Sequence, residues 1–382
     1  MESFITKDGK KLRRGYTSGS CCAAAAKTAA VLLLSGEALK TIHLTTPSGI
    51  ELDLPVQDLT LQGGTASCGI IKDSGDDPDV TNGITFFASV EKIPEPGVIR
   101  IEGGEGIGRV TKPGLDQPVG EAAVNSTPRR MITAALREVC EETGYSGGLC
   151  VTLSVPGGAE VAKKTFNPRL GIVGGLSILG TTGIIDPMSD DAVIETLRAE
   201  MSQRKAEGKT VLLLTPGNFG ADFIRDELGL DPAKAVTVSN YIGDALYAAE
   251  EFGFEGVLLV GHIGKLVKLA AGMFNTHSRY GDGRKEIFAA HAAACGAPAE
   301  TVRAILSGAV VDEMLSQLEA VRLRDAVMQA ILGQIDEQLA HRLSGRLRAA
   351  VITFSKVYGL LGETAGSEEL LTRVRAEYGK EE

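Results

Sequence analysis

The most regular pattern in the chain is a series of short apolar runs, each followed by a loop that contains glycine and polar residues. The runs occupy residues 211–214, 235–239 and 257–260 and consist mainly of Val, Leu and Ala. Such runs are typical of strands buried on both faces of a parallel sheet. Helical patterns follow the loops and begin at Ala221 after the first run and at Lys265 after the third. The repeated order of strand, loop and helix predicts a parallel sheet with right-handed crossovers.

The N-terminal half has a different pattern. Short strands alternate with turns between residues 40 and 110, which predicts an antiparallel or mixed sheet. A helix is expected to begin at Ser189 or Asp190 and to end at Gly208. The chain from Arg284 onward is mostly helical in spacing, with a late strand expected at residues 346–355 that could return to a sheet.

These patterns predict an α/β protein with two domains. A chain of 382 residues is longer than one typical hydrophobic core supports. We expect a mixed α+β domain at residues 1–205. We expect an open, mainly parallel α/β sheet domain at residues 206–382, with a helical C-terminal region and a late strand.

Composition and charge exclude several classes of function. The net charge of −10 argues against non-specific binding of nucleic acid. No apolar stretch is expected to reach the roughly 18–20 residues that span a bilayer, and the N-terminus lacks the apolar core of a signal peptide. The six cysteines are irregularly spaced and form no CxxC, which suits reduced thiols in the cytoplasm. We expect a cytoplasmic protein that binds a small molecule, without membrane or nucleic-acid partners, and the sequence leaves a homo-oligomer open.

The loops after the three apolar runs are the first candidate site. Open parallel sheets bind ligands at the carboxyl ends of their strands, and each of these loops carries glycine together with Asn, Asp or His. The candidate residues are Gly217, Asn218, Gly220, Ser239, Asn240, Gly243, Asp244, Gly261 and His262.

A second candidate site lies near the N-terminus, where Arg13 and Arg14 precede Thr17, Ser18 and Ser20 and then an Ala-rich helix. Ser, Thr and Gly at a helix start cap the helix and leave backbone N–H groups free for a carboxylate or a phosphate. The alternative is a capped core helix without a ligand. Both interpretations remain open from the sequence.

Three further stretches are candidate binding loops. Asp76, Asp77 and Asp79 lie within residues 75–83, but the spacing is not that of an EF-hand, so we expect a polar loop that faces the substrate, or a solvated turn, and no metal site. Residues 102–109 resemble a dinucleotide fingerprint but lack its third glycine. Residues 167–189 are glycine-rich, apolar and nearly uncharged, which favours buried backbone that lines a cleft or a domain junction.

Several of these stretches together resemble the CbiD family, the cobalt-precorrin-5B C1-methyltransferases of anaerobic cobalamin biosynthesis. The resemblance covers most of the chain, and one departure is that Ser18 and Ser20 stand where Thr is expected. The stretches are RRGYTSGSCCAAAAK, GDDPDVTNGI, GGEGIGRVTKPGL, NPRLGIVGGLSILGTTGIIDPMS, TPGNFG, SNYIGDAL and GHIGKLVKLAAGMFNTHS.

The resemblance implies methyl transfer from S-adenosylmethionine to carbon C1 of a cobalt-bound contracted tetrapyrrole. The products would be cobalt-precorrin-6A and S-adenosylhomocysteine, with cobalt present only as part of the substrate. Direct displacement at carbon requires alignment of the reactants more than a protein nucleophile. A proton acceptor is still needed, and the candidates are His262, Asp244 and Asp79, with His262 ranked first because it can titrate near neutral pH.

The candidate residues divide between the two reactants. Because open parallel sheets bind ligands at the carboxyl ends of their strands, we assign the residues of these loops to the methyl donor: Gly217, Asn218, Gly220, Ser239, Asn240, Gly243, Asp244 and Gly261. An acidic protein needs local cations for a substrate that carries many carboxylates, and Arg13 and Lys268 are further candidates for this role. The residues expected to contact the tetrapyrrole are Arg14, Thr17, Ser18, Ser20, Thr81, Asn82, Arg169, Thr181, Thr182, Lys265, Asn275 and His277.

Two other functions remain possible from the sequence. The first is a small-molecule kinase that uses the Ser/Gly loop before the Ala-rich helix, although the chain lacks the P-loop pattern GxxxxGK[ST]. The second is a non-catalytic carrier of a corrinoid intermediate. His291 and His341 lie in helical stretches and are expected to be structural.

Overall fold

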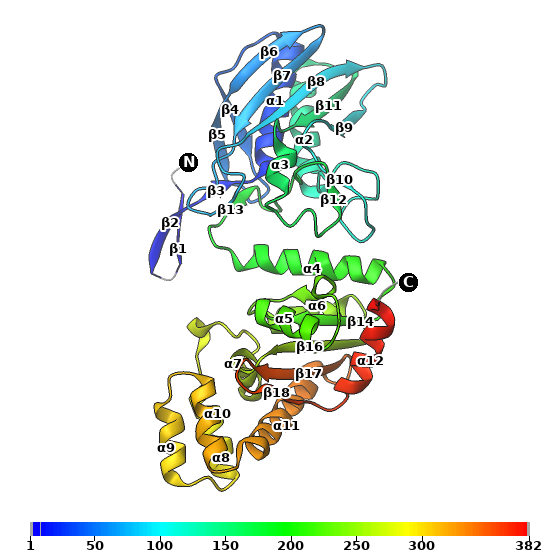
Figure 1. Ribbon diagram of the computed structural model, residues 1–382. Coiled ribbons are helices and arrows are strands. Elements are labelled where there is room, and N and C mark those ends of the chain that lie inside the picture. The colour runs from blue at the N-terminus through cyan, green and yellow to red at the C-terminus, as the bar shows by residue number, and fades with distance from the viewer. Residues whose placement is uncertain (1–2, 8, 380–382) are drawn as a thin grey trace. The chain divides into compact units, whose positions relative to one another are not determined.

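A computed structural model describes residues 3–7 and 9–379 of the chain (Figure 1). The described chain forms two compact units that divide between Ala192 and Val193. The boundary expected from the sequence lay at residues 205 and 206, close to the C-terminal end of the helix that contains the observed division, α4 (Asp190–Ala206). Each unit is described by itself below.

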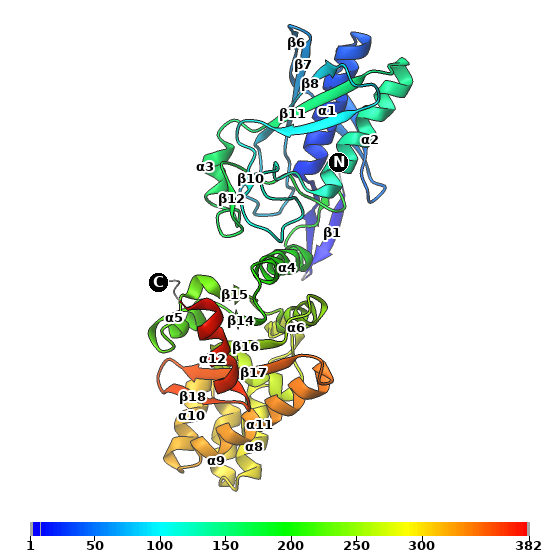
Figure 2. The ribbon, with the colours of Figure 1, turned by 90° about the vertical axis from the view of Figure 1, so that its right-hand side faces the viewer.

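The first unit is built on a five-stranded mixed sheet with the strand order β6-β7-β8-β11-β9. Neighbouring strands are antiparallel except for β11 and β9, which are parallel. Two long helices, α1 and α2, lie side by side, and α1 packs against β7 and β8 (Figure 2). The elements are β1 (Phe4–Lys7), β2 (Lys10–Arg13), β3 (Gly15–Tyr16), α1 (Ser18–Ser35), β4 (Thr41–Thr45), β5 (Glu51–Pro55), β6 (Gln57–Gln62), β7 (Thr65–Ile71), β8 (Thr85–Ile93), β9 (Ile99–Gly103), β10 (Arg109–Val110), α2 (Ser126–Thr143), β11 (Gly148–Ser154), α3 (Gly158–Ala162), β12 (Ile172–Val173) and β13 (Ile184–Ile185).

Helix α1 forms the centre of this unit. Ala23, Ala24, Ala25 and Ala26 are fully buried, because their small side chains allow the neighbouring helix and strands to approach closely. By length and composition α1 could cross a membrane, so the prediction that no apolar stretch reaches that length was wrong. However, 78% of this helix window is buried inside the protein, as expected for a core helix.

The second unit contains the predicted parallel sheet. Its strand order is β15-β14-β16-β17-β18, with β18 antiparallel at the edge and the other neighbours parallel. The elements are α4, β14 (Val211–Thr215), α5 (Asn218–Asp226), η1 (Pro232–Lys234), β15 (Val236–Thr237), α6 (Ile242–Glu251), β16 (Gly256–His262), α7 (Ile263–Leu266), η2 (Val267–Ala271), η3 (Ser278–Tyr280), α8 (Arg284–Ala294), α9 (Ala299–Ser307), α10 (Val311–Ala320), α11 (Arg324–Leu343), β17 (Arg348–Ser355), β18 (Gly359–Glu363) and α12 (Ser367–Tyr378).

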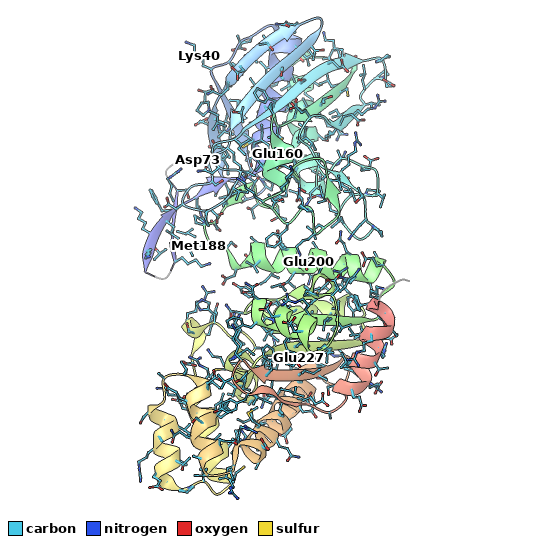
Figure 3. All side chains as sticks on the ribbon, in the orientation of Figure 1. Lys40, Asp73, Glu160, Met188, Glu200 and Glu227 are labelled. Carbon is cyan, nitrogen blue, oxygen red and sulfur yellow. The ribbon has the colours of Figure 1, made fainter. Side chains whose placement is uncertain are left out.

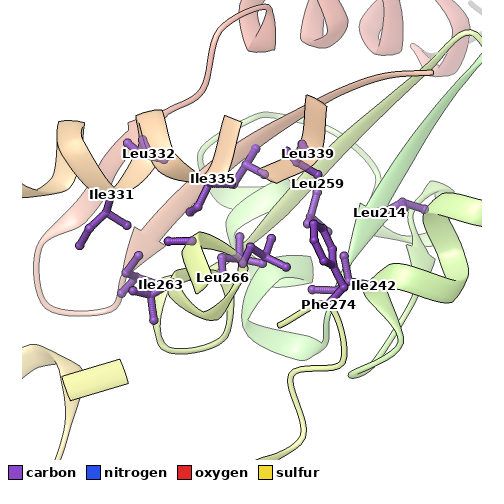
Figure 4. Packing of buried hydrophobic residues seen from close by; sticks show 14 of the residues in the cluster. Leu214, Ile242, Leu259, Ile263, Leu266, Phe274, Ile331, Leu332, Ile335 and Leu339 are labelled. Carbon is purple, nitrogen blue, oxygen red and sulfur yellow. The ribbon is translucent and has the colours of Figure 1, made fainter. Parts of the chain in front are cut away.

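Burial on both faces explains why the strands of this sheet are continuously apolar. Along β16, Val257 and Leu259 belong to a core shared with α6 and α11 (Figure 4). Leu258 and Val260 belong to the opposite core, shared with α5 and α12. The prediction of doubly buried strands is therefore confirmed, as is the predicted α/β class with a mixed first half and a late strand, β17, that joins the sheet.

Some details differ from the sequence-based expectation. The loop expected between residue 260 and Lys265 is shorter than predicted, because β16 continues as far as His262 and the helix after it begins at Ile263. This helix is one short turn followed by a 3-10 helix, not a long amphipathic helix. The prediction of buried backbone at 167–189 was only partly right, because Val173 and Leu179 are exposed while Ile178 is fully buried.

Candidate functional site

The C-terminal ends of β14, β15 and β16 lie at one edge of the sheet in the second unit, as parallel strands require. We call this edge, with its loops at residues 215–220, 238–244 and 261–264, the strand-end edge. The ammonium group of Lys265 donates hydrogen bonds to the carbonyl oxygens of Pro216 at 3.1 Å and Ser239 at 3.3 Å. One side chain therefore links the first two loops. Burial, with a smaller contribution from the charge of Lys268, lowers the pKa of Lys265.

The second loop is held by the segment that follows η2. The hydroxyl of Thr276 donates to the side-chain oxygen of Asn240 at 3.1 Å, and the backbone N–H of Thr276 donates to the carbonyl of Asn240 at 3.0 Å. Tyr241 and Asn275 form an isolated antiparallel bridge. Buried Lys268 donates to the carbonyl of Thr276 at 3.1 Å. The structure thus brings Asn275 to the strand-end edge through backbone pairing.

His277, which follows Thr276, makes only local hydrogen bonds among the described residues. The Nδ1 atom of His277 accepts a hydrogen bond from the backbone N–H of Arg279 at 3.1 Å, and His277 thereby caps the short helix η3. The backbone N–H of His277 in turn donates to the side-chain oxygen of Asn275 at 3.1 Å.

His262 ends β16 and caps the next helix. Its Nδ1 atom accepts a hydrogen bond from the backbone N–H of Gly264 at 3.1 Å. A neutral imidazole that accepts at Nδ1 carries its proton at Nε2, so Nε2 is a donor. Burial, opposed by the charge of Asp312 and assisted by that of Lys356, lowers the pKa of His262.

This geometry bears on the ranking of His262 first as a base, which stays a prediction. The ring nitrogen that has a lone pair is already occupied by Gly264, and the other nitrogen bears the proton. His262 is therefore placed to donate a hydrogen bond in its neutral form. To accept a proton it would have to release its helix cap.

Aromatic rings surround His262. The ring of Phe354, at the end of β17, meets it edge-on at 5.7 Å between centroids, and the ring of Phe219 lies 6.0 Å away. Phe354 also stacks on Phe223 at 4.2 Å. Phe219 is 49% exposed, and the ammonium of Lys356 lies 3.5 Å from its ring centroid. An exposed ring that already attracts one cation is a surface that could attract another.

Asp244 and Asp79 have opposite environments. Asp244 lies in the first turn of α6 and is half-buried, and within the described residues its carboxylate has no hydrogen-bond partner. Asp79 forms an ion pair with buried Lys72 and accepts hydrogen bonds from the hydroxyl of Thr81 at 2.6 Å and its backbone N–H at 2.7 Å. Burial alone would raise the pKa of Asp79, but Lys72 and Thr81 outweigh it and lower the pKa. A carboxylate so stabilised is a poor proton acceptor.

The start of α1 is closed by its own chain. The backbone N–H of Gly19 donates to the carbonyl of Leu179 at 3.1 Å, and Ser20 N–H donates to the hydroxyl of Thr17 at 3.3 Å. The hydroxyl of Ser18 donates to the Leu179 carbonyl at 3.2 Å, and that of Ser20 to the Gly183 carbonyl at 2.7 Å. Thr17, Ser18 and Ser20 are buried. The expectation of free N–H groups for an anion at this helix start was therefore wrong at Gly19 and Ser20.

The other polar residues predicted in the first unit also hold loops. The side chain of Asn82 accepts from the backbone N–H of Ser74 at 2.9 Å, and Arg14 pairs with Asp186 at 2.6 Å. Thr182 donates to the carbonyl of Ile184 at 2.9 Å. The side chains of Arg169 and Thr181 are exposed. Their assignment to the tetrapyrrole stays a prediction.

Arg13, the residue before Arg14, is also paired with a carboxylate. Arg13 donates two hydrogen bonds to the carboxylate of Asp73, at 2.5 and 2.7 Å; the position of Asp73 is labelled in Figure 3. The hydrogen bonds from Arg13, against the opposing effect of burial, hold the pKa of Asp73 below its usual value. Arg13, expected as a free cation for substrate carboxylates, is thus neutralised by the chain. Among the described residues there is no group of three or more His, Cys, Asp or Glu that could hold a metal ion.

Comparison with known proteins decides the family. A family model described as CbiD matches residues 5–187, and one described as the CbiD C-terminal domain matches residues 275–365. A protein from Ruminiclostridium cellulolyticum named cobalt-precorrin-5B C(1)-methyltransferase is 50% identical over 93% of this chain and 92% of its own. The chain belongs to the CbiD family.

Further relatives carry the same name. A protein from Alkaliphilus metalliredigens, also named cobalt-precorrin-5B C(1)-methyltransferase, is 42% identical over 100% of both chains. A cobalamin biosynthesis protein (cbiD) from Archaeoglobus fulgidus, known from a crystal structure, is 30% identical over 74% of this chain and 87% of that chain, with a TM-score of 0.39. Within this CbiD chain, the predicted donor residues all fall on the strand-end edge.

Sequence reasoning missed several residues around this edge. Phe219 lies inside the TPGNFG motif, so its aromatic side chain beside the glycines was a usable signal. Phe354 lies near the end of the late strand and Lys356 directly follows it. That strand was expected to return to the sheet but was not connected to the site. Asp312 has a buried Oδ1 atom without a hydrogen-bond partner, and its charge acts on His262. No local pattern marks Asp312.

Proposed function

We propose that this protein methylates carbon C1 of cobalt-precorrin-5B with S-adenosylmethionine, giving cobalt-precorrin-6A and S-adenosylhomocysteine. The observation that carries the proposal is the match to relatives of that name along nearly the whole chain, at up to 50% identity. The cobalt belongs to the substrate. The absence of any disulfide among the six free cysteines agrees with a reducing compartment, and we propose that the reaction takes place in the cytoplasm.

We propose that the methyl donor binds at the strand-end edge. Ligands of open parallel sheets bind at this edge, and Gly217, Asn218 and Gly220 begin the first helix there. The exposed ring of Phe219 offers a π-face to a sulfonium, which is attracted in the same way as the ammonium of Lys356. The positive charge of the methyl donor is thus complementary to the electron-rich face of Phe219.

The transfer is a direct displacement. The bond between C1 and the methyl carbon forms as the bond between sulfur and that carbon breaks, and sulfur keeps the electron pair. The positive charge left on the conjugated macrocycle is removed when a proton leaves to a base. The protein's contribution is to align the two reactants and to receive the proton, so no protein nucleophile is required.

Asp244 is the base that we favour. Its carboxylate lies at the strand-end edge and is not neutralised by another described side chain, whereas Asp79 is paired with Lys72. His262 is neutral and donates from Nε2, so we assign it to orienting a polar group of a reactant. These roles are proposals that rest on geometry.

The two other functions lose their support. The kinase reading depended on open N–H groups at the start of α1, and the Leu179 and Gly183 carbonyls occupy this region. A non-catalytic carrier would bind the tetrapyrrole without a methyl donor. Binding and use of S-adenosylmethionine therefore distinguish the proposed enzyme from both alternatives.

The test is methyl transfer from labelled S-adenosylmethionine to cobalt-precorrin-5B. We expect the tetrapyrrole mass to rise by one methylene equivalent and S-adenosylhomocysteine to accumulate in equal amount. Asp244→Asn should lower kcat by about 10²–10⁴-fold, the range for loss of a general base. Donor binding without transfer in the wild-type protein would argue against the proposed reaction, and labelled ATP hydrolysis would favour the kinase.

A further inference from the structure

Arg342, near the end of α11, has an unusual environment for an arginine. Its guanidinium contacts two aromatic rings, with Cζ 4.3 Å from the ring centroid of Tyr247 and 4.4 Å from that of Phe274. Tyr247 belongs to α6, and Phe274 immediately precedes Asn275. Contact with two rings limits the positions that the guanidinium can take before any ligand arrives.

The charge of Arg342 is not balanced by the protein. Its Nε atom is buried without a hydrogen-bond partner. Within the described part of the chain, Arg342 forms no ion pair. Arg346, a few residues further on, pairs with Glu250 at 2.7 Å, so a carboxylate partner is provided nearby for one arginine and not for the other. A guanidinium without an acceptor normally faces water or a ligand anion.

The position of the guanidinium connects it to the strand-end edge. Gly243 lies in the first turn of α6, and a Cβ atom on Gly243 would lie 2.6 Å from Nη2 of Arg342. The glycine of the SNYIGDAL motif thus makes room for this guanidinium. The backbone N–H of Gly243 donates to the Phe274 carbonyl at 3.0 Å, which fixes the two segments together.

The electrostatics of this place favour an anion. The N-terminal end of a helix carries a partial positive charge, so a cation beside the first turn of α6 raises the local positive potential. Asp244 lies in the same turn and offsets part of this potential, but it does not pair with Arg342. A bound carboxylate would give the guanidinium its missing acceptor and would also be favoured by the helix end.

We propose that Arg342 binds a carboxylate of a reactant, with Tyr247 and Phe274 holding the guanidinium in place. This inference rests on the proposed function, because it requires a reactant at the strand-end edge. The carboxylate belongs either to the amino-acid end of the methyl donor or to a side chain of the tetrapyrrole. The planar fork of arginine can donate hydrogen bonds to both oxygens of a carboxylate at once.

The experiment compares S-adenosylhomocysteine with its decarboxylated analogue, S-adenosyl-3-thiopropylamine, by calorimetric titration of the full chain. Arg342→Met should weaken binding of S-adenosylhomocysteine by at least tenfold and leave binding of the analogue unchanged. Arg346→Met, which also removes one positive charge beside α6, should change neither. Arg342→Lys keeps the charge but not the fork, and should recover only part of the lost affinity.

The second source of the carboxylate gives a different result. If Arg342→Met binds S-adenosylhomocysteine normally, the KM for cobalt-precorrin-5B should rise by at least tenfold instead. Unchanged affinity for the first ligand together with an unchanged KM for the second would overturn the inference. If wild-type protein binds no S-adenosylhomocysteine and transfers no methyl group, the proposed function is wrong and the inference falls with it.

A second variant tests the same site independently, in case Arg342→Met does not fold. Gly243→Ala keeps the charge and displaces the guanidinium, because the new Cβ atom would overlap Nη2. This variant should weaken the same ligand that Arg342→Met weakens. Normal binding of both ligands by a folded Gly243→Ala protein would contradict the proposed position of the carboxylate.

Discussion

The Cβ position of Gly220 lies 1.9 Å from the hydroxyl oxygen of Thr215 and 2.8 Å from the carbonyl oxygen of Val260. The first turn of α5 therefore rests directly on the ends of β14 and β16, with no room for a side chain. Gly220→Ala should force these strand ends apart and lower the free energy of unfolding by about 1–3 kcal/mol, the usual cost of overpacking. Urea unfolding followed by circular dichroism measures this change.

Gly217 provides the matched control. A Cβ atom on Gly217 would meet no other atom within 4 Å, and its backbone is extended. Gly217→Ala should leave unfolding unchanged within about 0.5 kcal/mol. Equal destabilisation by both variants would contradict the packing described here for the first loop.

His262 should tolerate a substitution that keeps its hydrogen bond to Gly264. The side-chain oxygen of asparagine can replace Nδ1 as the helix cap. The free energy of unfolding of His262→Asn should therefore lie within about 1 kcal/mol of wild type, whereas that of His262→Ala should fall by about 0.5–2 kcal/mol. If His262 is not the base, kcat of His262→Asn should stay within about tenfold of wild type. A loss of more than 10²-fold in a folded protein would restore His262 as the proton acceptor.

The lowered pKa of His262 predicts a dependence of stability on pH. Because the unfolded histidine titrates near 6.5 and the folded one lower, the unfolded chain binds more protons between the two values. Stability should therefore fall as the pH drops through this window. Wild type should lose more stability than His262→Asn between about pH 7 and pH 5, measured by urea unfolding at each pH. An identical loss in both proteins would show that His262 is not desolvated.

The sequence predicted the parallel sheet well for a physical reason. Residues 211–214 and 257–260 are buried on both faces, so their composition alone is distinctive. The edge strand β18 was not predicted, because its partly exposed residues give a weak pattern. Helix α12 was also missed, since the tail was treated as one helical region ending in a strand.

The candidate site was less predictable, because its contacts join distant parts of the chain. The expected anion site at the start of α1 is closed by the Leu179 and Gly183 carbonyls, which no pattern near Thr17 reveals. Arg342 meets Gly243 and Phe274 only in the folded unit. The cap at His262 is different, since a histidine two residues before Gly264 at a strand end was a local signal that could have been used.

The thiols should differ strongly in reactivity. Burial raises the pKa of Cys21 to about 12 and that of Cys68 to about 11, and both side chains are fully buried. Since the thiolate is the reactive form, iodoacetamide at neutral pH should leave both unlabelled in the folded protein. Half-buried Cys295 should be labelled earlier, as mass spectrometry of peptides would detect. Labelling of Cys21 or Cys68 at the rate of the urea-unfolded chain would contradict this burial.

The Lys72–Asp79 pair should be important for the stability of the first unit. Lys72 is only 5% exposed, and Asp79→Asn would leave its ammonium group without a counter-ion. Breaking a fully buried pair costs about 3–5 kcal/mol; because the Asp79 side chain is partly exposed, we expect about 2–3 kcal/mol at pH 7. The exposed Asp76 is the matched control, because asparagine there can still accept the hydrogen bond from the backbone N–H of Arg13.

The pH dependence of this pair follows from the lowered pKa of Asp79. Its stabilising contribution is present above the usual value of 3.8 and is lost as the pH falls through the lower, folded value. The difference between wild type and Asp79→Asn should therefore be largest near neutral pH and shrink below about pH 4. Asp76→Asn should cost less than about 0.5 kcal/mol across this range. If Asp79→Asn were as stable as Asp76→Asn at pH 7, the hydroxyl of Thr81 and the amide oxygen of the asparagine would suffice for the ammonium of Lys72, and the charge of Asp79 would not hold this loop.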